Sequence, residues 1–360
     1  MMLDLSIKLA LAGIVLFGAL NLAGLHTWVE RKQSALMQDR IGANRASIFG
    51  FTLLGLFHPL ADAIKMFTKE DFVPAGADKF LHSLAPFLSV FFALAAFACI
   101  PFGDRLILGG RAIELQAAKL DVALLYVLAM LSMGVYGVML AGFSSKNNYA
   151  VMGGLRACAQ MISYEIALGI SLIGVVMVYG TVDLQELVRA QGRAVLGGWI
   201  PLWGIVVQPV AFLVFLTAAL AETKRAPFDL PEGESEIIGY FVEYSGMKFG
   251  MFFMTDFIET VLVACLATTL FFGGWQVPYL FADGFHFPWG SMVLLPHLAY
   301  VLLGVTSFSV KVIAFCWLFM LIRWTLPRFR YDQLMNLGWL GLFPVAVVNI
   351  LVTGLAVVLL

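Results

Sequence analysis

The sequence predicts an all-α polytopic membrane protein with about eight transmembrane helices. Hydrophobic residues make up 61% of the 360 positions and charged residues only 12%, whereas a soluble domain averages about 25% charged residues. The mean hydropathy is +0.92, and apolar stretches of about 20 residues, enough to cross a ~30 Å hydrocarbon core, recur along the chain. These three observations exclude a soluble globular enzyme, a disordered chain and a disulfide scaffold.

Eight stretches have the length and apolarity of a membrane-spanning helix. Trp28, Trp275 and Trp324 close three of them. Trp199 and Trp339 open two others. Because tryptophan favours the membrane interface, these positions support the predicted limits. The stretches cover about residues 5–29, 81–102, 121–141, 157–179, 198–221, 246–273, 299–324 and 339–360.

An even number of crossings places both termini on one side of the membrane, and the basic residues indicate which side. Of the 22 lysines and arginines, 15 fall in the loops after the first, third, fifth and seventh stretches, six fall on the opposite side, and Lys311 lies within a stretch. By the positive-inside rule the richer side is cytoplasmic, so both termini are expected to be periplasmic. The whole chain, residues 1–360, is then one membrane domain, with cytoplasmic loops at about 30–80, 142–156, 222–245 and 325–338.

The first cytoplasmic loop contains a helical pattern. Leu53, Leu56, Phe57, Leu60, Ile64 and Phe67 recur at helical spacing. Pro59 interrupts them, so we expect a kinked or two-part helix. Asp62, Lys65 and Lys69 fall on its other face. Two interpretations remain open: an amphipathic helix lying in the interface, or a re-entrant helix lining the mouth of a cavity.

The third cytoplasmic loop is unusually acidic for a basic side of a membrane protein. Its bases are Lys224 and Arg225. A solvated acidic loop is the ordinary interpretation. Apolar residues interleave with the acids, however, and this favours a loop buried against partners or lining a polar cavity. Its six acids are Glu222, Asp229, Glu232, Glu234, Glu236 and Glu243.

Ionisable residues also fall within the predicted spans, where each costs about 2.5–3.5 kcal/mol at a helix centre. They are Glu165, Asp256, Glu259 and Lys311. The i,i+3 spacing of Asp256 and Glu259 places both on one helix face. A buried structural pair of lysine and carboxylate is one explanation. The other is a proton relay, because burial moves the pKa values of carboxyl groups and amines toward neutrality.

The sequence indicates no cofactor bound by this chain alone. The cysteines are Cys99, Cys158, Cys265 and Cys316, and without any C-x-x-C spacing they predict neither a zinc nor an iron–sulfur site. No G-x-G occurs, so a nucleotide-binding fingerprint is absent. The net charge of −1 provides no field that would attract nucleic acid. We therefore expect no metal, and any redox cofactors on other chains.

Each cytoplasmic loop carries a distinctive motif: ERK at 30–32, QDRIG at 38–42 and PLADAIK at 59–65; SSKNNY at 144–149 and GGLR at 153–156; AETKRAPFDLPE at 221–232; and RWTLPRFRYDQLM at 323–335. Together these motifs resemble the H-subunit family of proton-translocating NADH–quinone oxidoreductase, whose mitochondrial counterpart is subunit one of respiratory complex I. The resemblance extends over nearly the whole chain.

The resemblance implies a subunit of an H⁺-translocating enzyme in a bacterial inner membrane. It implies quinone as the substrate, and flavin mononucleotide and iron–sulfur clusters on partner subunits. The partners implied are the peripheral-arm quinone-site and iron–sulfur subunits, small membrane subunits and antiporter-like subunits. The residues implied for a quinone chamber are Arg31, Arg40, Phe57, Asp62, Lys65, Phe67, Phe228 and Arg323. Those implied for a carboxylate relay are Glu165, Glu222, Asp229, Glu232, Glu234, Glu236, Glu243, Asp256, Glu259 and Lys311.

Two other functions remain open on the sequence. One is the equivalent subunit of a membrane-bound hydrogenase or another complex-I-like enzyme. The full acidic loop favours the quinone enzyme over this alternative, but only by degree. The other is an autonomous ion/proton antiporter, which requires transport by the isolated chain.

Overall fold

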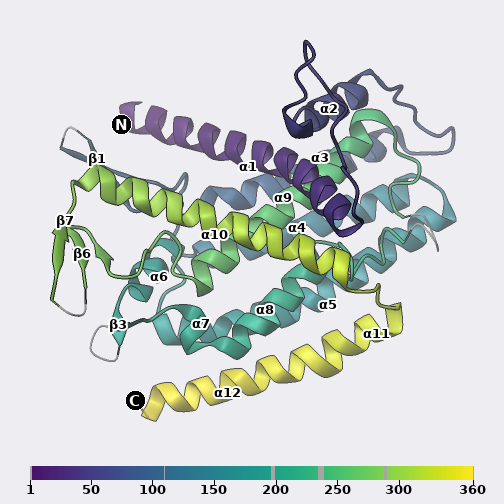
Figure 1. Cartoon of the computed structure of the whole chain (residues 1–360). Coiled ribbons are helices and arrows are strands. Elements are labelled where there is room, and N and C mark those ends of the chain that lie inside the picture. Colours follow the sequence, from purple (N-terminus) through teal and green to yellow (C-terminus); the bar gives the residue numbers. More distant parts are fainter. Residues whose placement is uncertain (1, 109, 196–198, 234–238, 288–289, 360) are drawn as a thin grey trace.

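Seven helices of the described residues are long and apolar enough to cross a membrane, and they run side by side in a bundle (Figure 1). The computed structural model describes residues 2–108, 110–195, 199–233, 239–287 and 290–359. This arrangement confirms the all-α membrane fold. The seven are α1 (Met2–Met37), α3 (Lys79–Ala96), α4 (Ala123–Ser144), α5 (Asn148–Tyr179), α9 (Gly246–Phe271), α10 (His297–Thr325), and α11 (Tyr331–Asn336) running through a π-helical turn (Leu337–Leu342) into α12 (Phe343–Leu359).

The predicted crossing at 198–221 is not one helix, and the expectation of an unbroken span there is wrong. It divides into a single turn, α7 (Gly204–Val207), and α8 (Pro209–Glu222). Proline has no N–H to donate to the preceding turn, and Gln208 before it leaves the helical conformation with φ −131° and ψ 58°. The 14 residues of α8 rise only about 21 Å.

The side chain of Gln208 is hydrogen-bonded at the point where the helix breaks inside the bundle. Its Nε2 donates to the hydroxyl of Thr353, 2.7 Å away, and its Oε1 accepts from Nδ2 of Asn349 at 2.9 Å. Both partners belong to α12. Both polar atoms of the Gln208 side chain are therefore satisfied by α12 at the point where the helix breaks.

Both termini lie at the same end of the bundle (Figure 1), so α7 and α8 together serve as the eighth passage. We call this end the terminus end. It also carries the short elements that connect the long helices. They are the 3-10 turn after α3 (Phe97–Cys99), β1 (Arg105–Leu108), β2 (Arg111–Glu114), α6 (Leu184–Gln191), β3 (Ala194–Val195), β4 (Ile200–Pro201), β5 (Leu280–Phe281), β6 (Gly284–His286) and β7 (Met292–Leu294). All strand pairs are antiparallel: β1 with β2, β3 with β4, and β6 between β5 and β7.

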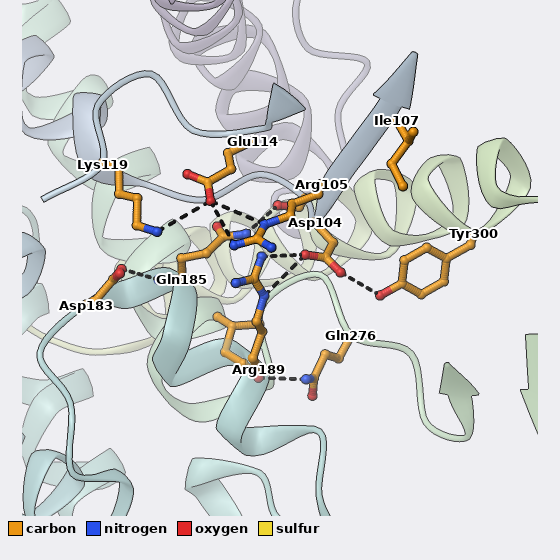
Figure 2. A network of polar contacts seen from close by, with 12 residues as sticks. Asp104, Arg105, Ile107, Glu114, Lys119, Asp183, Gln185, Arg189, Gln276 and Tyr300 are labelled. Carbon is orange, nitrogen blue, oxygen red and sulfur yellow. Dashed lines mark hydrogen bonds and ion pairs between the residues drawn. The ribbon is translucent and has the colours of Figure 1, made fainter. Parts of the chain in front are cut away.

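A polar network ties the terminus end together (Figure 2). Arg189 on α6 forms an ion pair of 2.8 Å with Asp104, which precedes β1. The hydroxyl of Tyr300 on α10 donates to the other carboxylate oxygen of Asp104 at 3.1 Å. One carboxylate thereby links α6, the β1–β2 hairpin and α10.

The opposite end, which we call the loop end, carries α2 (His58–Thr68), the segments 223–233 and 239–245 and the turn between α10 and α11. The predicted kinked or two-part helix is one helix, α2, preceded by a three-residue 3-10 turn (Leu53–Gly55) in which Leu53 and Leu54 have positive φ. Pro59 lies in the first turn of α2, where a missing N–H costs nothing.

The loop expected at 142–156 is mostly helix. Helix α5 begins at Asn148 and not near 157, and the Asn147 side chain caps it by accepting the N–H of Tyr149 at 3.0 Å. This extension is packed rather than solvated. A Cβ on Gly153 would lie 2.9 Å from the backbone nitrogen of Tyr240, so only glycine lets segment 239–244 approach α5 this closely.

Helix α9 is the centre of the bundle. In its most apolar window 78% of the residues are buried, against 11% for α1 and 11% for the C-terminal span. A charged group within this window of α9 is therefore far from water and lipid, and it must find its partners within the protein.

We expect Gly153→Ala to destabilise the protein by about 1–3 kcal/mol, because the added methyl group must displace backbone. Gly169→Ala on the same helix is the control, since a Cβ there meets nothing within 4 Å. Thermal unfolding of the solubilised complex measures the difference. Equal stability of the two variants would show that segment 239–244 does not pack on α5 as described.

Candidate functional site

Lys224 is the centre of a buried charge cluster at the loop end. Its side chain is 1% exposed, and its ammonium lies 3.2 Å from Oδ1 of Asp256 and 3.3 Å from Oε2 of Glu259. Both acids lie on the same face of α9, as their spacing predicts. Lys224 follows the end of α8 with φ +55°. This left-handed backbone conformation is uncommon for lysine. It occurs where the side chain turns into the protein.

A third acid, Glu232 in the loop after α8, also interacts with the ammonium of Lys224. Burial opposes the charge of Lys224, but the carboxylates of Glu259, Asp256 and Glu232 outweigh burial and raise the pKa of its ammonium. Burial also raises the pKa of Glu232, and the charge of Asp256 and a hydrogen bond between the two carboxyl groups add to this effect. Lys224 thus stays charged, while Glu232 is held toward its protonated form.

The cluster continues along α4 and α5. Oε1 of Glu259 lies 3.8 Å from the position of a Cβ on Gly134 of α4. Two residues earlier on α4, the hydroxyl of Ser132 donates to Glu165 of α5. Glu222 is buried, with Oε2 unpaired among the described residues, and it lies within electrostatic reach of Glu259 and Glu165. The structure therefore brings the predicted acids of α5, α8 and α9 together.

A second buried site joins three elements through Glu30 of α1. One carboxylate oxygen lies 3.0 Å from Nη1 of Arg225, and the other lies 2.7 Å from Nη1 of Arg323 on α10. The guanidinium of Arg225 also stacks 3.7 Å above the ring of Phe257 on α9. This clamp fixes segment 223–230 between α1, α9 and α10.

Asp229 holds the same segment from the other side. It pairs with Arg328 at 2.7 Å, yet burial, the largest effect, raises the pKa of its carboxyl group. Phe228 stacks on Phe329 with 5.4 Å between ring centroids. Gln160 on α5 donates to the carbonyl of Phe228 at 2.8 Å. The turn after α10 thereby covers the charge cluster.

Glu243 belongs to the periphery of the cluster. It accepts a hydrogen bond of 2.8 Å from Asn147, and its carbonyl lies 3.3 Å from Nε2 of His82. The ring of His82 stacks on Tyr244 at 3.9 Å. These contacts hold the end of the loop against α3 and α5. Glu234 and Glu236 lie outside the described residues.

A cavity of about 240 Å³ opens between α1, α2 and α9 at the loop end. Asp62 and Phe67 of α2 line it, together with Thr27 of α1 and apolar residues of α9. Asp62 pairs with Arg31 at 2.5 Å and with Lys65 at 3.5 Å. The cavity is therefore apolar with a charged edge, and the ion-paired Glu30 lies one helical turn beyond Thr27.

Other predicted site residues lie elsewhere. Phe57 is partly buried beside α2, Arg40 bonds to Gln38 and Ser34 near the end of α1, and Phe228 is in the core. Lys311 donates to the carbonyls of residues 272, 274 and 276 at 2.8, 3.0 and 2.6 Å. These groups end α9, roughly 20 Å along the helix axis from Glu259, so Lys311 ties α10 to α9 and is separate from the cluster.

The sequence did not single out Lys224, Arg225, Glu30 or Ser132 as site residues. Lys224 and Arg225 counted only as bases that offset the acids of their loop, and Glu30 only as part of a motif. Their partners are far away along the chain, so spacing carries no signal for the pairs. For Ser132, the sequence does offer a signal, because a polar side chain stands within an apolar stretch.

Among the residues that the structure describes, no group of three or more His, Cys, Asp or Glu side chains is arranged to hold a metal ion. The four cysteines are buried and unpaired. They lie after α3 and on α5, α9 and α10.

Comparison with known proteins covers nearly the whole chain. A family model described as NADH dehydrogenase matches residues 9–354. An NADH-quinone oxidoreductase H subunit of Geobacter metallireducens, numbered 1, is 46% identical over 98% of this chain and 97% of its own length. The H subunit from Thermomicrobium roseum is 46% identical over 96% and 94%, and that from Flavobacterium johnsoniae is 41% identical over 95% and 92%. The chain therefore belongs to the NADH dehydrogenase family, among the H subunits of NADH–quinone oxidoreductase.

Proposed function

We propose that this subunit forms the access chamber for a membrane quinone and a carboxylate relay that couples quinone reduction to proton translocation. The relatives are named as subunits of an enzyme that acts on NADH and quinone. Electrons then come from NADH through flavin and iron–sulfur clusters on partner subunits. The loop end faces the cytoplasm, and both termini face the periplasm of a bacterial inner membrane. The observation that carries the proposal is the buried contact of Lys224 with Asp256 and Glu259.

The cavity between α1, α2 and α9 suits the entry of a quinone. An isoprenoid tail requires an apolar wall, which Phe67 and residues of α9 provide. A headgroup requires polar partners near the end of the tail, and Asp62 with Arg31 lies at the edge. Glu30 and its two arginines extend this polar track into the protein.

The charge cluster suits proton exchange because its members are coupled. Reduction of a quinone to a quinol takes up two electrons and two protons. Removing a proton from Glu232 changes the charge that Lys224 experiences, so the two groups are electrostatically coupled. Glu259, Glu222 and Glu165 continue this coupling from α9 to α5. Quinone chemistry at the loop end can thereby alter proton occupancy deep in the bundle.

Lys224 is the first test of the relay. Lys224→Met leaves buried acids without a counter-charge, which costs about 3–5 kcal/mol, so we expect little assembled enzyme. Lys224→Met combined with Asp256→Asn removes one charge of each sign, and we expect it to assemble. Its NADH oxidation with an artificial acceptor should stay normal while quinone reductase activity falls about tenfold or more. Full coupled quinone activity in the assembled double variant would contradict the relay.

Glu165 tests the far end of the relay. Glu165→Gln keeps the size and hydrogen bonding of the side chain but cannot titrate, so we expect normal assembly and loss of proton pumping coupled to quinone reduction. Glu186→Gln, at an exposed carboxylate of α6, is the control and should have no effect. Pumping is measured in proteoliposomes as acidification driven by NADH. Wild-type pumping by the Glu165→Gln enzyme would show that Glu165 has only a structural role.

Phe67 tests the chamber. Its ring lines the cavity while remaining 70% exposed. We expect Phe67→Ala to raise the KM for a long-tailed quinone about threefold to tenfold, through lost apolar contact, and to leave the KM for a short-tailed analogue unchanged. Phe80→Ala, at a similarly exposed ring of α3 outside this cavity, is the control. An equal effect on both quinones would place the tail elsewhere.

A further inference from the structure

A large apolar cavity lies at the terminus end, away from the quinone chamber. Its volume is about 410 Å³, and α1, the turn after α3, α9 and α10 surround it. Gly18 and Ile14 line it from α1, Cys265 from α9 and Phe308 from α10. This volume is in the range of small-molecule sites, and its walls are almost wholly hydrocarbon.

A basic cleft of about 290 Å³ adjoins the apolar cavity, and both include Leu11 and Gln116 in their walls. The cleft has four cationic side chains and one anionic one, so its net charge is +3. Glu114 pairs with Arg105 at 3.3 Å and Lys119 at 3.4 Å, as Figure 2 shows. The remaining two cations, Lys8 and Arg111, have no ion pair with any described residue. The charged lining consists of Lys8, Arg105, Arg111, Glu114 and Lys119.

Gln116, which lines both spaces, has an incomplete hydrogen-bond set. It is 4% exposed. Its Nε2 donates to the carbonyl of Cys99 at 2.8 Å, but its buried Oε1 has no partner among the described residues. An unsatisfied buried acceptor costs about 1–3 kcal/mol. A ligand that presents a hydroxyl donor at the junction of cleft and cavity would relieve this cost.

We propose that the cleft and the cavity together bind one anionic glycerophospholipid. Lys8 and Arg111 hold the phosphate, a hydroxyl of the polar headgroup donates to Oε1 of Gln116, and an acyl chain fills the apolar cavity. A second apolar cavity, of about 330 Å³, has Val15 and Ala117 in common with the first and accepts the second chain. Three spaces joined in this order match a headgroup and two tails.

The charge of the cleft distinguishes this occupant from the alternatives. A quinone headgroup is uncharged and gains little from unpaired cations. A transmembrane helix of a partner subunit would fill the apolar space but would leave Lys8 and Arg111 without anions. An anionic lipid satisfies both halves of the site. The site lies at the end opposite the proposed relay and does not depend on it.

The test measures the lipid retained by the assembled enzyme after delipidation and exposure to phosphatidylglycerol or phosphatidylcholine. Wild-type enzyme should retain about one more molar equivalent of phosphatidylglycerol than Gly18→Leu, whose side chain projects into the cavity. Gly13→Leu is the matched control, because it lies on the same helix, has equally open surroundings and lines none of the three spaces. Mass spectrometry of extracted lipid gives the counts.

The combined change of Lys8→Gln and Arg111→Gln should abolish the preference for phosphatidylglycerol over phosphatidylcholine. Arg193→Gln, a basic residue at the same end but outside the cleft, should retain it. Equal retention of phosphatidylglycerol by wild type and Gly18→Leu would overturn the proposal. So would displacement of the lipid by a long-tailed quinone, or failure of Gly18→Leu alone to assemble, which would indicate a helix of a partner subunit in the cavity.

Discussion

The rest of the loop end depends on one interaction, the burial of Lys224 between Asp256 and Glu259. A charge placed this far from water is stable only when opposite charges compensate it. Here two carboxylates from one face of the central helix do so, at 3.2 and 3.3 Å. The segment after α8 must therefore enter the protein, which brings Glu222, Asp229 and Glu232 close to α9.

The remaining contacts hold that segment in place. Glu30 joins it to α1 and α10 through Arg225 and Arg323, and the turn after α10 covers it through Arg328 and Phe329. Because the same helices, α1 and α9, also border the loop-end cavity, an event in the cavity and the charge state of the cluster act on shared elements. This common scaffold is the physical basis of the proposed coupling.

The sequence predicts much of this architecture, because a membrane requires long apolar helices and penalises charges within them. The long apolar helices, a helix beginning near Pro59 and the common face of Asp256 and Glu259 all follow from local patterns. The break at Gln208 depends on a partner helix, α12, more than 140 residues away along the chain, and the extension of α5 depends on packing at Gly153. The role of Lys224 depends on tertiary contacts that no spacing encodes. The contacts of Lys311, an intramembrane charge predicted for the relay, are likewise tertiary, because its ammonium donates to backbone carbonyls at the end of α9.

The central claim is that quinone reduction changes the protonation of the carboxyl groups around Lys224. Infrared difference spectroscopy of the assembled enzyme, with the quinone oxidised and then reduced, observes this change directly through the carbonyl stretch of protonated carboxyl groups. We expect a carboxyl band that changes on reduction in the wild-type enzyme and is lost in Glu232→Gln, while the exposed-site variant Glu186→Gln keeps it. A redox-induced carboxyl spectrum that is the same in the wild type and in Glu232→Gln would show that Glu232 does not change its protonation with the quinone.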